Sequence, residues 1–157
     1  MNDDAIEDRL HEFLQEAVDA AEEGHTLHGA ENHDTVYTSI GEFGYRIGDC
    51  NADVAPLPDG EGMDEFDARL FLICFARVAG QDKTERKAAR AKARALHLAA
   101  GQLFFGDTTM GGRVGDVLMK RGRRGFDLEN DDVYAVVNIP LLINGTGQLI
   151  DDEERDF

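Results

Sequence analysis

The stretch FDARLFLICFARVA, residues 66–79, decides how the rest of the chain must be arranged. Every second residue through it is apolar, which predicts a β-strand with one buried face. Phe71, Ile73 and Phe75 make the middle of the other face apolar as well. We therefore expect this strand to be covered on both sides, by a helix and by a further element or another subunit.

Two amphipathic helices are predicted on either side of this strand in the sequence. Residues 3–23 carry apolar side chains at three- and four-residue steps, and Gly24 ends the pattern. Residues 82–104 form a longer, alanine-rich helix that Asp82 caps. The side of this helix opposite its basic residues is expected to face the sheet, with Ala88, Ala95, Leu96, Ala99 and Leu103.

The remaining strands are shorter. Glycine-punctuated segments predict strands at 36–40, 45–47 and 53–57. After the long helix, residues 113–120 and 133–144 are expected to be strands joined by the link RGRRGFDLENDD, residues 121–132. Pro140 lies within the last strand and predicts an edge position or a bulge, because proline cannot donate a ladder hydrogen bond.

The order of these elements predicts an α+β fold. Strands lie before and after one long helix, which is typical of a two-layer sandwich with a mainly antiparallel β-sheet packed against that helix and an N-terminal helix. Residues 1–150 have the length of a single α/β domain, and residues 151–157 are expected to be an acidic mobile tail.

The charge of the chain restricts its partners. It holds 32 acidic and 16 basic residues, a net charge of −16, which predicts repulsion from nucleic acid by the molecule as a whole. No apolar run approaches the roughly 20 residues that a membrane span needs, so no membrane partner is expected. The excess of aspartate and arginine over glutamate and lysine is typical both of salt-loving organisms and of GC-rich genomes.

No catalytic motif is present, so we expect neither an enzyme nor a cofactor. No serine lies in a GxSxG turn, and GDTTMGGRVGD lacks the GxxxxGK[ST] spacing that holds phosphates. The weak metal-ligand candidates are His25, His28 and His33, whose spacing favours a solvated loop over a metal site. A disulfide between Cys50 and Cys74 is not favoured.

The basic residues are gathered into two segments, which hold 11 of the 16. A solvated helix face is the ordinary explanation of such a cluster, and contact with DNA in a lumen is another. In so acidic a chain, however, two positive patches favour head-to-tail contacts between copies. The expected subunit-interface residues are Lys83, Arg86, Lys87, Arg90 and Arg94 in the helix and Arg113, Arg121, Arg123 and Arg124 after it.

The layout resembles that of tail terminator proteins, the minor tail proteins of long-tailed bacterial and archaeal viruses. The resemblance rests on the long strand, the basic helix KTERKAARAKARALHLAAGQL, the segment GGRVGDVLMKRG and the closing strand VYAVVNIPLLIN, and covers residues 3–144. It implies a virion protein, assembled in the host cytoplasm, that forms a homohexameric ring on the tail tube protein at its head-proximal end. It also implies a head-tail connector protein as the second partner and, with the salt-loving composition, a halophilic host.

Three other functions remain open from the sequence. Within the same class, the alternative is another neck component, such as a head-tail connector protein. A small metal-dependent enzyme would use the loop with His25, His28 and His33. A small acidic regulatory module would bind its partner through the basic helix.

Overall fold

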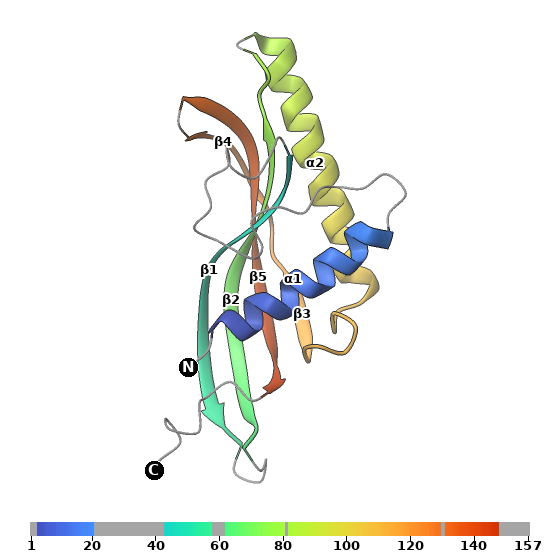
Figure 1. Cartoon of the computed structure of the whole chain (residues 1–157), viewed down its shortest axis with the longest axis vertical. Helices are drawn as coiled ribbons and strands as arrows, with labels where there is room; N and C mark the ends of the chain where they lie inside the picture. The colour runs from blue at the N-terminus through green and yellow to red at the C-terminus, as the bar shows by residue number, and fades with distance from the viewer. Residues whose placement is uncertain (1–2, 21–42, 58–61, 81, 130, 148–157) are drawn as a thin grey trace.

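The computed structural model describes residues 3–20, 43–57, 62–80, 82–129 and 131–147 (Figure 1). Its elements follow the order helix, two strands, helix, three strands. They are α1 (Asp3–Ala20), β1 (Phe43–Pro56), β2 (Asp64–Arg77), α2 (Lys83–Gly106), β3 (Asp116–Met119), β4 (Arg123–Glu129) and β5 (Asp132–Gly147).

Within the described residues, all the strands belong to one antiparallel sheet of five strands. The order across it is β1-β2-β5, and β3 and β4 both pair with the other edge of β5. β4 pairs with the first half of β5, whereas β3 pairs with its second half. The two short strands therefore lie end to end along one neighbour.

Both helices cover the same face of the sheet, and their apolar stripes join one core. The alternate residues Phe66 to Ala76 of β2 are buried on this face, as the 66–79 pattern predicts. The Phe13 and Phe104 rings, from α1 and α2, lie 5.7 Å apart between their centroids. The Tyr45 hydroxyl donates to the Leu96 carbonyl oxygen at 3.1 Å and so ties β1 to α2. The predicted two-layer α+β fold is confirmed.

The other face of the sheet is not covered by a helix among the described residues (Figure 1). Near the middle of this open face, Phe71 is 40% exposed and Leu118 is 48% exposed. Phe75, further along β2, is fully buried, and its ring contacts that of Tyr134 edge-on. The cover expected over the whole middle of β2 is therefore present at Phe75 and incomplete at Phe71.

The early strands differ from the prediction. Residues 43–56 form one continuous strand, and the register with β2 shifts between Gly48 and Asn51. The glycines that indicated strand ends lie within this strand, so they accommodate an irregularity instead of ending it. The strand predicted at 36–40 lies outside the described residues.

The segment 121–132, expected to be only a link, contains β4 and the turn that joins it to β5. Pro140 also differs, because it lies in the central strand β5 opposite Phe71. Its carbonyl oxygen accepts a hydrogen bond from the Lys120 N–H at 2.9 Å, so its nitrogen faces the break between β3 and β4. The hydrogen-bond donor that proline lacks is therefore missing at a position where neither β3 nor β4 pairs with β5.

The start of α2 follows the prediction, whereas its buried face follows it only in part, with Leu96 buried and Leu103 packed against the core. The Asp82 carboxylate accepts from the Glu85 N–H at 2.9 Å and caps the helix. Ala88 and Ala95, expected against the sheet, are exposed. The buried residues are Ala89, Ala93, Leu96, Ala100, Gly101 and Phe104. At about 100° per residue, this stripe borders the basic stripe instead of lying opposite it.

Candidate functional site

The basic side chains predicted on α2 all reach the surface along one side of the helix. Because the buried stripe borders them, this side faces the margin of the sheet and not open solvent alone. The exposed residues are Lys83, Arg86, Lys87, Arg90 and Arg94.

β4 brings the second basic cluster to the same place. Along β4 the side chains alternate between the two faces of the sheet. Arg124 and Phe126 pair with Val137 and Ala135, which belong to the helix-covered face. Arg123 pairs with Asn138 and points to the open face. Of the two neighbouring arginines, only Arg124 therefore joins the residues of α2.

Between α2 and β4 lies a groove of about 660 Å³, which we call the basic groove. Four cationic side chains surround an apolar floor, and none of the described residues that line it is acidic. Its lining residues are Lys87, Arg90, Ala91, Arg94, Ala95, Leu98, Arg124, Gly125, Phe126, Val136 and Val137.

Aromatic stacking holds the helix cations over the strand. The guanidinium carbons of Arg86 and Arg90 lie 5.4 and 5.6 Å from the centroid of the Phe126 ring. Each such contact stabilises by about 0.5–1 kcal/mol at an exposed site. Phe126 remains 42% exposed, so the ring supports the two arginines without closing the groove.

His97 marks the inner end of this cationic region. Partial burial and, to a smaller extent, the Arg124 guanidinium lower the pKa of His97 below its ordinary value. Gly122 packs so closely on the imidazole that a Cβ there would lie 2.9 Å from its Cε1. The neutral form of His97 is therefore favoured beside the groove.

The other predicted interface residues lie elsewhere. Arg113 is turned toward α1, where it makes ion pairs with Glu12 and Glu16 and donates to the Met110 carbonyl oxygen at 3.0 Å. Arg121 is exposed and does not line the groove. Lys92 is exposed, and its Nζ lies 4.9 Å from the Phe43 ring centroid, away from the groove lining.

Carboxylates gather at the opposite end of the sheet. Asp53, Asp67, Asn144 and Asp116 stand in register on β1, β2, β5 and β3, and all four are exposed on the open face. We call Asp53, Asp67 and Asp116 the acidic row. Arg69 lies 3.9 Å from Asp53, and both side chains are largely solvated.

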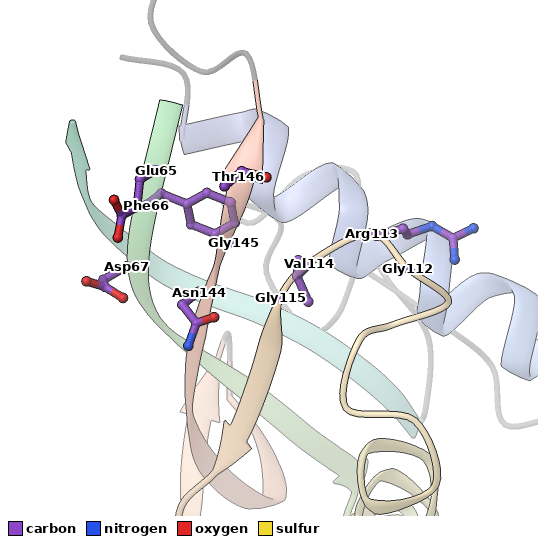
Figure 2. A pocket seen from close by; sticks show the side chains of 10 residues that line it. All are labelled: Glu65, Phe66, Asp67, Gly112, Arg113, Val114, Gly115, Asn144, Gly145 and Thr146. Carbon is purple, nitrogen blue, oxygen red and sulfur yellow. The ribbon is translucent and has the colours of Figure 1, made fainter. Parts of the chain in front are cut away.

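A second hollow, of about 500 Å³, lies beside the acidic row. Figure 2 shows Asp67 and Asn144 on neighbouring strands at its margin, whereas the Arg113 side chain points away from them. Glu65 lines it as well. The hollow is acidic where the basic groove is cationic, so the two concave surfaces differ in charge.

Sequence reasoning found the cations of the basic groove but not its floor. Leu98 was not singled out, and Phe126 lay in the segment expected to be a link. The alternation of Arg124, Phe126 and Leu128 is a strand pattern that could have revealed it. The acidic row could not be found, because it depends on the pairing of four strands.

Metal and redox chemistry gain no support here. His25, His28 and His33 lie outside the described residues, and the part of the chain that the structure describes contains no cluster of three or more metal-ligating side chains. Cys50 and Cys74 are not joined in a disulfide bond, and burial raises the pKa of the Cys74 thiol well above its ordinary value.

No protein-family model matches the chain, and no match was found among curated proteins. None of the helices in the described residues is both long and apolar enough for a membrane span.

Proposed function

We propose that the protein is a structural subunit that assembles head to tail with copies of itself into a ring. The observation that carries this proposal is the separation of the two charged surfaces. The basic groove lies beside the first half of β5 on the helix side, and the acidic row lies beside its second half on the open face.

Each surface is incomplete in a single copy. Four cations line the basic groove without a carboxylate among its described lining residues. In the acidic row, Asp53 and Asp67 are directly opposite each other, an arrangement that destabilises a strand pair. Contact between the groove of one copy and the acidic row of the next would give the groove cations carboxylate partners. It would also reduce the repulsion between Asp53 and Asp67.

The geometry of such a contact favours a closed ring. A two-fold dimer can pair two unlike surfaces reciprocally only if both lie on one side of the copy. Here the basic groove lies on the helix side of the sheet and the acidic row on its open face. Repeated contacts between unlike patches generate a ring when the rotation between copies closes. Opposite charges would fix the register and orientation of this contact.

Within this class, we propose a tail terminator: a virion protein whose ring caps the tail tube and contacts the head-tail connector. The support is the resemblance in element order and character from residue 3 to 144. Many unrelated functions share such folds, so the role depends on the assembly and its partners.

The test combines light scattering with electron microscopy of the purified chain. We expect particles of one defined subunit number with a central opening, and binding of these particles to one end of isolated tail tubes. A chain that is monomeric at every protein and salt concentration would contradict the ring. Rings that do not bind tail tubes would contradict the tail terminator role but not the ring.

A further inference from the structure

We infer that the basic groove receives the acidic segment 151–157 of a neighbouring copy. The inference rests on the proposed function, because it names the occupant of a contact between copies. The first argument for it is chemical complementarity. The segment DDEERDF holds five carboxylates, one arginine and one phenylalanine. The groove offers four cations around Leu98, Phe126 and Val136.

Three of the four cations suit carboxylates particularly well. Arg90, Arg94 and Arg124 present planar guanidinium groups, which bind carboxylates through two parallel hydrogen bonds. The stacking of Arg90 on Phe126 already holds one of them in place. If the segment binds in an extended conformation, Asp152, Glu154 and Asp156 would share one side and direct three carboxylates toward these groups.

Distance argues that the segment comes from another copy. The groove adjoins Val137, and ten residues of extended β5 separate it from Gly147, a span of roughly 33 Å. From Gly147 the chain to Glu154 is seven residues, which reach roughly 25 Å at most. The backbone at Glu154 therefore ends about 8 Å short of Val137 in its own copy, so seating the whole segment in the groove requires a neighbouring copy.

The same distance places the segment correctly for the proposed ring. β5 ends at Gly147 (Figure 1), three residues beyond Asn144, which pairs with Asp67 and Asp116 of the acidic row. The segment thus continues from the acidic end of the molecule, which is the end proposed to meet the groove of the next copy. One interface then contains both contacts.

The inference is tested with two cysteine variants of the full chain, both in a Cys50→Ala background. One carries Ala91→Cys in the groove and the other carries Asp152→Cys in the segment. Mixing them under mild oxidation is expected to give a covalent dimer. A mixture of Ala91→Cys with Asp8→Cys, an exposed position on α1, controls for random collision and is expected to give none.

A charge test checks the energetics of the same contact. Asp152→Asn with Glu154→Gln is expected to raise the protein concentration for half-assembly by about tenfold, equivalent to 1.4 kcal/mol. The control, Asp8→Asn with Asp131→Asn, removes two exposed carboxylates elsewhere. It is expected to change the protein concentration for half-assembly by less than about twofold.

The outcomes separate the two proposals. Assembly of the wild-type chain without the covalent dimer, or with equal effects of the two charge variants, overturns the inference and leaves the ring intact. A wild-type chain that never assembles overturns the proposed function itself.

Discussion

β3 and β4 lie along the same edge of β5, yet the two halves of that edge differ in charge and in packing. Beside β4 the strand edge opens into the basic groove, and Gly125 has free space around it. Beside β3 the backbones approach closely, and Asp116 pairs with Asn144 and adds a carboxylate to the acidic row. Position along a single strand thus separates a cationic surface from an anionic one. A composition with twice as many acidic as basic residues does not reveal this separation.

The largest expected effect comes from reversing the charge of the groove. Arg90→Glu with Arg94→Glu is expected to abolish assembly, because the groove would then repel the acidic end of the next copy. Both side chains are exposed, so the fold of the single copy should persist. Light scattering reports assembly, and far-ultraviolet circular dichroism reports the fold.

The matched control variant makes the same change in net charge at two positions outside the basic groove. Lys83→Glu with Arg123→Glu alters two exposed residues that do not line it. We expect assembly close to that of the wild type. Equal loss in both variants would mean that net charge, and not the groove, governs association.

A smaller effect is expected from filling the close approach beside β3. A Cβ on Gly145 would lie 2.9 Å from the Gly115 nitrogen and 3.1 Å from the Phe66 ring. Gly145→Ala is therefore expected to lower the free energy of unfolding by about 2 kcal/mol. Gly125→Ala, in the open half, is expected to change it by less than about 0.5 kcal/mol. Urea denaturation measures both, and similar losses would show that the two halves do not differ in packing.

Removing one carboxylate from the acidic row is expected to change the stability of the single copy and the strength of assembly in opposite directions. Asp67→Asn ends the like-charge pairing with Asp53 and is expected to stabilise the single copy by about 0.5 kcal/mol. The same substitution is expected to weaken assembly, because the row loses a carboxylate. Thermal unfolding and light scattering measure the two quantities. Tighter assembly of this variant would show that the acidic row is not part of the interface between copies.

The smallest effect concerns His97, beside the groove. Burial and Arg124 lower its pKa in the folded state, so the unfolded chain binds a proton more readily than the folded chain does. Stability from His97 is therefore complete above the ordinary pKa of about 6.5 and declines as the pH falls below it. In denaturation curves from pH 8 to pH 5, His97→Gln should show less decline than the wild type. An identical decline in the two proteins would show that His97 does not contribute to this pH dependence of stability.

The parts of the fold that sequence could predict are those governed by local patterns. The alternation of residues 66–79 marked β2, and the carboxylate of Asp82 marked the start of α2. The face of α2 was misassigned because alanines surround the helix, so small residues at Ala88 and Ala95 matched the buried stripe by composition alone.

What could not be predicted depends on pairing between distant segments. Arg124 meets Arg90 only because β4 folds back on β5, and Asp53 meets Asp67 only through the register of β1 with β2. The cations of the candidate site were therefore found individually. The groove that unites them, its aromatic floor and the acidic row follow from the sheet.

Native mass spectrometry of the full chain, together with light scattering from low to molar salt, tests the central claim most directly. The account predicts a closed oligomer whose mass is one fixed multiple of 17.3 kDa, lost on reversal of Arg90 and Arg94 and retained in the off-groove control. A species of 17.3 kDa at every salt and protein concentration would contradict it.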